Sequence, residues 1–213
     1  MSITMKIHLI LIFLLASITL YSQDKYQIVS NTSTVRIQIK DASHKLNSLQ
    51  ADFIQKKDLT FLNEVIQSEG KFIFQSPNSI RWEYTEPYQY LIIIDNNVIK
   101  IKNEQKESQF DMASNPIFKQ INKLMLSTVK GDILLNKDFS SKVYENKTTY
   151  KIELLPQDKN MQEFISTIAL ILNKKDLTVI SIKLTEPSED YTLITFSNKI
   201  LNEIIPKNSF LLH

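Results

Sequence analysis

The sequence of 213 residues has no cysteine, two glycines and three histidines, and these scarcities exclude much familiar chemistry. Without cysteine the chain forms no disulfide and offers neither a thiolate metal ligand nor a thiol nucleophile. Gly70 and Gly131 stand too far apart to build a GxGxxG or GxxxxGK phosphate-binding loop. Because His8 lies in a hydrophobic leader and His213 is the last residue, His44 is the one internal histidine. A Ser-His-Asp triad or a multi-histidine zinc site is therefore not expected.

Arginine is almost absent as well, since Arg36 and Arg81 are the only two. The 25 basic and 23 acidic residues give a net charge of +2, without the concentrated basic face that nucleic-acid binding requires. The hydrophobic fraction of 43% and the charged fraction of 23% are those of an ordinary globular protein. The composition thus indicates a globular chain with a sizeable core, no nucleic-acid partner and no cofactor.

The first 22 residues have the pattern of a secretory signal peptide. Lys6 supplies a positive charge, residues 7–15 are nearly all apolar, and small residues follow up to Ser22. An uncleaved membrane anchor is the alternative, but the apolar run is shorter than the about 20 residues that span a bilayer. We expect cleavage after Ser22, a mature chain of residues 23–213 that folds as one domain, and a soluble protein outside the cytoplasm.

Two segments have the apolar spacing of amphipathic helices. The first, residues 32–49, has its stripe at Val35, Ile39, Ala42, Leu46 and Leu49. The second, residues 115–128, follows Pro116 and has its stripe at Ile117, Ile121, Leu124, Met125 and Thr128. Spacing alone leaves open whether each stripe packs in a core or forms a lid that lifts away.

The rest of the chain alternates apolar and polar residues as β-strands do. The expected strands are residues 48–57, 64–75, 80–84, 90–94, 98–102, 141–144, 149–155, 166–173, 177–185 and 191–198. Gly70 inside the second strand predicts a bulge or bend that helps the sheet to curl. So many consecutive antiparallel strands predict a mainly β fold of about eleven strands with two main helices, closed into a barrel or curled around something.

Several short motifs occur in an order that resembles the LolA family of outer-membrane lipoprotein carriers. The motifs are Phe53-Ile54-Gln55, Ser68-Glu69-Gly70, the run from Phe72 to Pro77, Arg81-Trp82-Glu83-Tyr84, Glu86-Pro87 and the run from Ile92 to Asn96. Near the C-terminus, the run from Phe164 to Asn173, Lys174-Lys175, and Thr195 to Asn198 with Leu201-Asn202 resemble the closing strands of that family. The resemblance covers residues 45–213.

This resemblance implies a fold and a function. The fold is an unclosed, strongly curved antiparallel sheet with helices as a lid around a hydrophobic cavity. The function is to receive acylated lipoproteins from an ATP-driven release complex in the inner membrane, to shield their acyl chains in the periplasm, and to pass them to an outer-membrane acceptor. It further implies a monomeric, non-enzymatic protein of a Gram-negative bacterium.

Period two and the resemblance together predict which residues handle the acyl chains. The predicted cavity residues are Ile66, Phe72, Phe74, Ile80, Trp82, Tyr84 and Ile92, and the predicted lid residues are Val35, Ile39, Leu46, Ile121, Leu124 and Met125. One departure is that Ser76 stands where many family members have an arginine that holds the lid. Arg81 is not at that position, whereas Ile80 matches a position of the lipid-handling surface.

Three alternatives remain open at this point. The apolar strand face is equally typical of a packed β-sandwich core, although a single long meander favours a cavity. A related carrier of another lipid, such as a glycolipid or a polyene precursor, has the same pattern, and the loss of the lid arginine favours it to some degree. An envelope hydrolase is the alternative from another class, with Glu83 and Glu86 as the pair of carboxylates.

Overall fold

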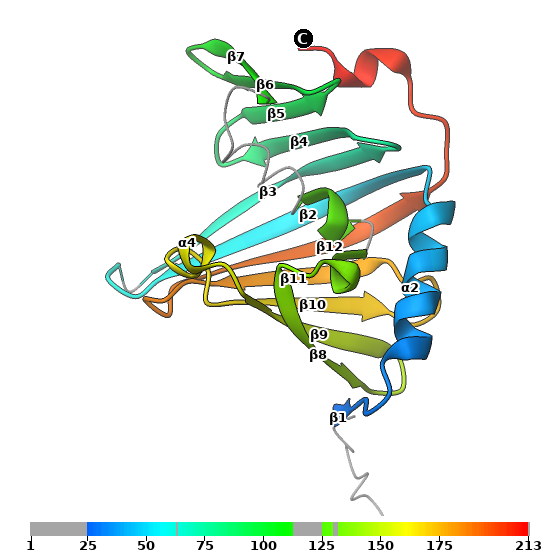
Figure 1. The fold of residues 1–213 in the computed structure, drawn as a ribbon. Coiled ribbons are helices and arrows are strands. Elements are labelled where there is room, and N and C mark those ends of the chain that lie inside the picture. The colour runs from blue at the N-terminus through cyan, green and yellow to red at the C-terminus, as the bar shows by residue number, and fades with distance from the viewer. Residues whose placement is uncertain (1–24, 63, 113–124, 130–131, 213) are drawn as a thin grey trace, which may run out of the picture.

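The computed structural model describes residues 25–62, 64–112, 125–129 and 132–212 (Figure 1). Twelve antiparallel strands form one sheet in the order β1-β8-β9-β10-β11-β12-β2-β3-β4-β5-β6-β7. The strands are β1 (Gln27–Ile28), β2 (Ser48–Leu59), β3 (Glu64–Gln75), β4 (Ser79–Glu86), β5 (Tyr90–Asp95), β6 (Val98–Asn103), β7 (Glu107–Asp111), β8 (Phe139–Glu145), β9 (Thr149–Pro156), β10 (Thr167–Asn173), β11 (Val179–Thr185) and β12 (Tyr191–Leu201). Because β1 and β7 are the two ends of this order and do not pair with each other, the sheet is unclosed, as expected.

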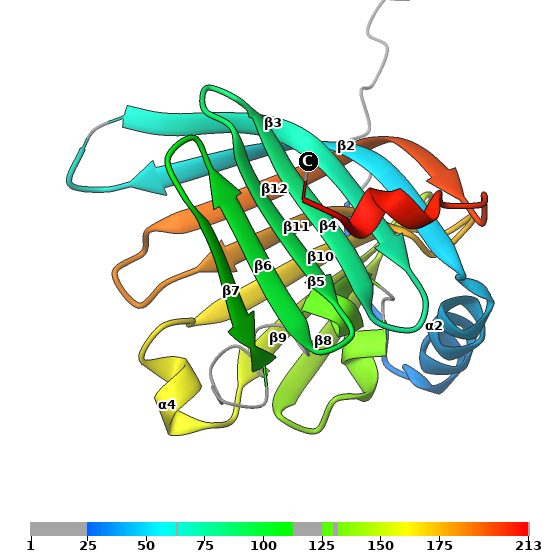
Figure 2. The same ribbon diagram turned by 90° about the horizontal axis from the view of Figure 1, so that it is seen from above.

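Short helices pack against the sheet. They are α2 (Ser33–Lys45), η2 (Asp132–Leu135), α4 (Lys159–Gln162), η3 (Lys207–Phe210) and the helical residues 125–129. Figure 2 shows the sheet curling so that β4 to β7 lie over the strands of the other half. We call the face toward α2 and η2 the inner face, and the opposite face, which η3 partly covers, the outer face.

Every strand expected from the sequence is present, and two edge strands were missed. β1 is two residues long, and β7 has the sequence ESQFD, in which polar residues stand at almost every position. Neither strand buries a side chain, so neither has the apolar alternation by which a strand is recognised. Edge strands of this kind are short and polar because an unpaired apolar edge invites aggregation.

The first expected helix was too long at its C-terminal end. α2 stops at Lys45, and Leu46 already has an extended backbone with φ −82° and ψ 101°. Leu49 therefore belongs to β2 and reaches the core from the sheet instead of from the helix. Of the second expected stripe, Met125 and Thr128 lie in helical residues 125–129, whereas Ile117, Ile121 and Leu124 lie outside the described residues.

Gly70 marks a bulge, as its position inside a strand predicted. The pairing of β3 with β4 shifts between Glu69 and Gly70. A Cβ atom at Gly70 would collide with the carbonyl oxygen of Glu83 and would lie 2.7 Å from the ring of Phe53. The missing side chain thus lets Phe53 lie across the strand at the point where the sheet bends.

Two separate hydrophobic clusters hold the fold together. The large cluster lies on the inner face, where α2 and η2 contribute to it alongside the sheet. The small cluster lies on the outer face and consists of Leu91, Ile93, Ile205 and Phe210. Since Leu91 and Ile93 are on β5 and the other two come from the C-terminal segment, both faces of the sheet are covered at β5.

Candidate functional site

The structure places all seven predicted cavity residues on the inner face. On β3 and β4, Phe72 pairs with Trp82 and Phe74 with Ile80, and on β5 Ile92 pairs with Trp82. Phe72, Phe74 and Ile80 are fully buried in the large cluster, and Trp82 is 6% exposed. Tyr84 and Ile92 are partly buried and pack against the same cluster.

Ile66 differs from the other six predicted cavity residues because its side chain is exposed. It shares the inner face by period two, but it pairs with Lys57 near the open end of the β2–β3 hairpin and is 38% exposed. Its neighbours in that hairpin, Phe61 and Val65, are more exposed still, at 75% and 52%. The predicted surface therefore runs from a buried interior out to an exposed apolar hairpin.

An aromatic cluster forms the centre of the inner face. The ring of Trp82 lies 4.7 Å from that of Phe53, 5.4 Å from that of Phe72 and 6.1 Å from that of Phe196, measured between centroids. Tyr84 meets Phe53 edge-on at 5.2 Å. Tilted and edge-to-face contacts of this kind are favourable arrangements of aromatic rings. Phe53 and Phe196 were not among the predicted site residues.

Two polar groups lie within this apolar surface. The Tyr84 hydroxyl donates to Gln55 Oε1 at 3.0 Å. Burial raises the pKa of Tyr84 above its usual value of 10.0, although the neighbouring Trp82 and Gln55 lower it in part. Trp82 Nε1 is buried and makes no hydrogen bond of normal geometry to the described residues. The inner face is therefore apolar with few polar groups, which suits binding without tight specificity.

The described lid residues cover the same cluster. Val35 and Ile39 of α2 are 5% and 1% exposed within it, and Leu46 and Met125 are partly buried against it. Ile121 and Leu124 lie outside the described residues. The covering position of α2 agrees with a lid and equally with a core helix, so the lid stays a prediction.

Arg36 fastens α2 to its surroundings. Its guanidinium donates to the carbonyl of Leu134 in η2, to Ser141 Oγ on β8 at 2.8 Å and to Thr32 Oγ1 at 3.2 Å. A planar guanidinium suits such multiple contacts because its donors have fixed directions. A side chain of α2 itself therefore makes the hydrogen bonds that hold this helix to η2 and β8.

The turn at Ser76, where many family members have an arginine, takes no part in these contacts of Arg36. Ser76 is exposed, and its backbone N–H donates to the Asn47 carbonyl at 2.8 Å. Arg81, the second arginine, lies on the outer face, where Nη1 donates to the carbonyls of Ser209 and Leu211 at 3.1 and 3.3 Å. Arg81 therefore holds the C-terminal segment and takes no part in fastening α2.

The geometry gives the hydrolase alternative little support. Glu83 Oε2 accepts from Arg81 Nε at 3.0 Å on the outer face, and Glu86 is exposed at the end of β4. None of the described cavities is lined by either carboxylate. Within the part of the chain that the structure describes, no group of His, Asp and Glu side chains has the arrangement of a metal site.

Three cavities lined by described residues lie away from the predicted acyl surface. One of them has a volume of about 460 Å³ and lies between α2 and the turn that joins β10 to β11. Among the predicted residues, only Leu46 lines it. The seven inner-face residues border none of the described cavities, so their role in binding remains a prediction.

Comparison with known families identifies the chain. A family model described as outer membrane lipoprotein carrier protein LolA matches residues 44–212. The chain belongs to the LolA family. The match begins and ends within one residue of the segment in which the sequence motifs resemble LolA. No match was found among curated proteins.

Solved structures from other organisms are similar to this chain in fold at very low sequence identity. One chain of the Pseudomonas aeruginosa MucA/MucB complex aligns with a TM-score of 0.51 and 10% identity, over 86% of this chain and 62% of that one. A LolA superfamily protein from Nitrosomonas europaea has a TM-score of 0.43 and 10% identity, over 83% and 97%. The Mycobacterium tuberculosis lipoprotein LppX has a TM-score of 0.44 and 12% identity, over 81% and 96%. At such identities the likeness concerns the fold alone.

Among the residues that the structure describes, no helix combines the length and the apolar character that a transmembrane helix needs.

Proposed function

We propose that this LolA-family protein carries the acyl chains of lipoproteins through the periplasm, from the inner to the outer membrane. The observation that carries the proposal is the family match over residues 44–212. The continuous apolar inner face of β3 to β5 supports it, with Phe72, Ile80 and Trp82 as central residues of the acyl site. The protein binds the chains without altering them and acts without a cofactor or a catalytic step.

Carrying acyl chains sets a physical requirement that the structure helps to meet. Each buried CH2 group contributes about 0.8 kcal/mol, so a chain of about 16 carbons gains on the order of 10 kcal/mol from full burial. A rigid, perfectly fitted pocket would not release such a chain. A helix that must separate from the sheet offsets part of this gain, because opening exposes Val35 and Ile39 and breaks the hydrogen bonds of Arg36.

The proposed partners follow from the same role. An ATP-driven release complex in the inner membrane supplies acylated lipoproteins, and an outer-membrane acceptor with a better site receives them. The predicted signal peptide, residues 1–22, takes the protein to the periplasm, where it acts as a monomer.

Mass spectrometry of complexes purified from the native periplasm tests this proposal. We expect an acylated lipoprotein bound to the wild-type protein and a much smaller amount bound to Ile80→Glu, because the new charge lies on the acyl surface. A glycolipid or polyene precursor in place of the lipoprotein would support the alternative cargo. Equal amounts of lipoprotein on the two proteins would contradict binding at the inner face.

A further inference from the structure

The cavity beside α2 has the size of a small-molecule site. Its volume of about 460 Å³ falls within the range of roughly 300–1,000 Å³ that is usual for ligand pockets. Its walls come from the C-terminal half of α2, Tyr150 near the start of β9, the turn between β10 and β11, and the end of β12. These elements are far apart in the sequence, so no local motif could have indicated the cavity.

The floor of this cavity is apolar and reaches the main core. Leu46, Leu177 and Leu201 line it, together with Ala42 and Val129. Val129 is a member of the large hydrophobic cluster, and Leu46 and Leu201 pack against that cluster. The floor therefore offers an apolar surface that an alkyl chain can cover.

Leu177 reaches the cavity at the cost of backbone strain. Its φ of 58° lies in the left-handed region, where glycine and asparagine are the usual residues. Its backbone N–H donates to the Asn173 carbonyl at 2.8 Å, which closes the turn. A large apolar side chain at such a position is unusual, and here it lines the cavity.

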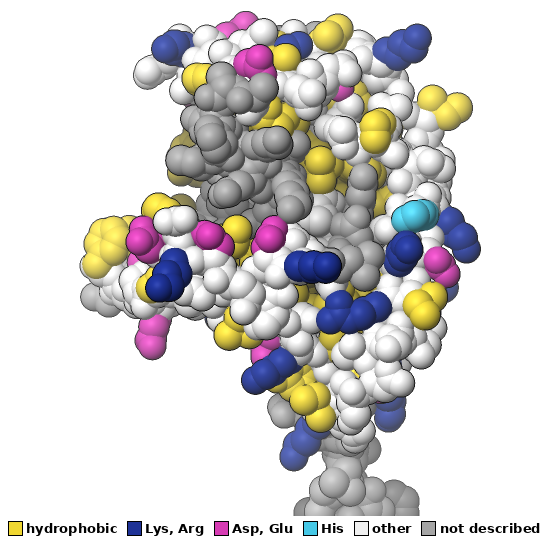
Figure 3. Space-filling view, in the orientation of Figure 1, with side chains coloured by type: hydrophobic (Ala, Val, Ile, Leu, Met, Phe, Trp, Pro, Cys, Tyr) yellow, Lys and Arg dark blue, Asp and Glu magenta, His cyan; other side chains and the backbone are white. Residues whose placement is uncertain are grey.

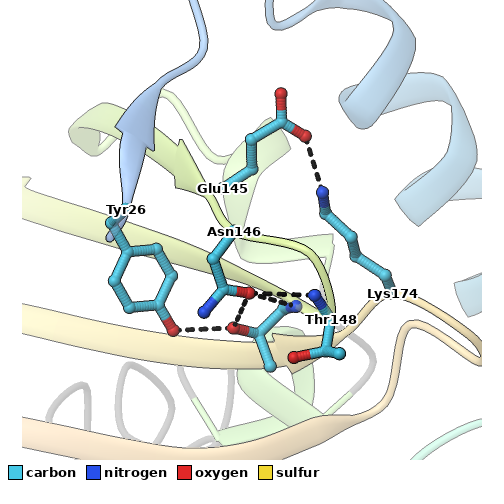
Figure 4. A network of polar contacts seen from close by, with 6 residues as sticks. Tyr26, Glu145, Asn146, Thr148 and Lys174 are labelled. Atoms are coloured by element: carbon cyan, nitrogen blue, oxygen red, sulfur yellow. Dashed lines mark hydrogen bonds and ion pairs between the residues drawn. The ribbon is translucent and has the colours of Figure 1, made fainter. Parts of the chain in front are cut away.

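Three lysines stand around the cavity, and one of them is already held in place. Lys174 Nζ lies 2.7 Å from Glu145 Oε2 (Figure 4). It also lies 4.7 Å from the centre of the Tyr150 ring. Its backbone N–H donates to the Thr148 carbonyl, beside the turn that Asn146 Oδ1 stabilises by accepting from Thr148 N. Lys174 thus forms a fixed, charge-compensated wall.

The other two lysines are exposed at the rim. Among the residues that the structure describes, the ammonium groups of Lys45 and Lys175 form no ion pair. Lys45 belongs to the last turn of α2 and Lys175 to the facing turn, so the two approach the cavity from different elements. Figure 3 shows basic and acidic side chains interspersed over the side of the molecule that α2 occupies.

Two aspartates also line the cavity. Asp176 Oδ1 accepts from Thr178 N at 2.9 Å and from Thr178 Oγ1 at 2.6 Å. Asp176 keeps its negative charge, and Lys199, which donates to the same Thr178 hydroxyl, interacts with this charge and offsets it. Asp41 on α2 then opposes the two rim lysines.

We propose that this cavity binds a single-chain amphiphile with an anionic head group, a carboxylate or a phosphate, which contacts Lys45 and Lys175. The alkyl chain lies against the three leucines of the floor. This site goes beyond the lipoprotein-carrier role, since it shares only Leu46 with the predicted lid and no residue with the predicted acyl surface.

Calorimetric titration of the purified protein with decanoate, decyl phosphate and decanol tests the proposal. We expect the two anions to bind more tightly than the alcohol. The double variant Lys45→Gln/Lys175→Gln should weaken their binding about tenfold, since two partly exposed charge contacts are lost. The matched control is Lys40→Gln/Lys159→Gln, which removes the same charge from exposed positions outside the cavity and should bind as the wild type does.

A second variant and a fluorescence measurement separate this site from the acyl surface. Ala42→Leu narrows the cavity beside its apolar floor and should weaken anion binding without lowering the melting temperature. Trp82, the single tryptophan, lies on the inner face and does not line the cavity, so its fluorescence should stay unchanged when decanoate binds. A strong change in Trp82 fluorescence would place decanoate on the acyl surface and overturn the proposal.

Two other results would overturn it as well. One is decanol binding as tightly as decanoate, with no effect of the rim lysines. The other is inorganic phosphate or acetate binding as tightly as the amphiphiles, which would mean an anion site without a role for the chain. Failure of lipoprotein transport with intact decanoate binding would refute the carrier role and leave this site standing.

Discussion

The two faces of the sheet at β4 and β5 are equally buried but differently covered. Ile80 on the inner face and Ile93 on the outer face both have 0% exposure. The inner face is covered by α2 and η2, which belong to separate parts of the chain, whereas the outer face is covered by the short C-terminal segment with Ile205 and Phe210. Burial alone therefore does not distinguish an acyl site from a structural core.

Each of the two arginines forms hydrogen bonds that hold one of these covering segments to the sheet. Arg36 reaches out from α2 to η2 and β8, and Arg81 reaches out from β4 to the carbonyls of Ser209 and Leu211. The inner cover consists of helical elements from two parts of the chain, whereas the outer cover is one short segment on a small cluster. We expect the inner face to be the one that opens.

Ile93→Lys should break the outer face most severely. The substitution places a cation in the small cluster, and the cross-strand neighbours of residue 93, Arg81 and Lys100, are cations that cannot compensate it. We expect a loss of more than about 4 kcal/mol in the free energy of unfolding. Urea denaturation measures it, and a loss below about 1 kcal/mol would mean that the outer cover opens easily and that the two faces are alike.

Gly70→Ala should cause the next largest loss in the free energy of unfolding. The added Cβ meets the Glu83 carbonyl and the Phe53 ring, and because a backbone atom cannot move aside, the bulge must open. Overpacking of this kind costs about 3 kcal/mol. Ser68→Ala, a buried position on the same strand and face, is the control and should change stability by less than about 1 kcal/mol. A thermal melt in which both variants behave alike would contradict the role given to Gly70.

The two arginines permit a paired experiment. Arg36→Gln should raise hydrogen exchange in α2, and Arg81→Gln should raise it in residues 207–211, each with a loss of about 1–3 kcal/mol because charged hydrogen bonds are broken. Only the first should speed the exchange of a bound acyl chain. If both variants speed that exchange equally, the assignment of α2 as the moving cover is wrong.

The smallest effect is expected for an ion pair on the sheet surface. Lys151 lies 2.7 Å from Glu153, and hydrogen bonding from Lys151 lowers the pKa of Glu153 below its usual value of 4.5. A carboxyl group whose pKa is lower in the folded state stabilises the fold at pH values above its unfolded-state pKa. This stabilisation is lost as the pH falls through the folded-state pKa. Since the two side chains are 34% and 28% exposed, Glu153→Gln should cost about 0.5 kcal/mol at pH 7. This cost should shrink as the pH falls below 4.5, and an equal cost at neutral and acid pH would exclude the ionic explanation.

The sequence predicts the strands and the inner face well because both depend on local periodicity. Alternation over β3 and β4 correctly placed Phe72, Phe74, Ile80 and Trp82 on one face. It could not add Phe53 and Phe196, since these rings come from β2 and β12, whose pairing joins distant parts of the chain. For the same reason the LolA resemblance was needed to predict what the sheet encloses.

The segments that cover the two faces of the sheet, and the cavity beside α2, were harder to predict. Nothing in the sequence marks Ile205 and Phe210 as core residues, because they are isolated apolar residues in a short segment without regular period. The fastening by Arg36 depends on η2 and β8, which lie about a hundred residues further along the chain. Sequence motifs could only indicate that the family arginine is missing at Ser76.

The central claim is that the inner face binds acyl chains, and one variant tests it most directly. A neutral hydrophobic fluorophore is bound to the wild-type protein and to Ile80→Glu, displaced with fatty acyl chains, and both proteins are melted. The account predicts a probe that acyl chains displace from the wild type, and an Ile80→Glu variant that stays folded but no longer takes up the chain, since a face that opens to water can solvate the carboxylate. A folded wild type with no displaceable probe, together with an unfolded Ile80→Glu, would show that the inner face is a dry core like the outer one and would contradict the account.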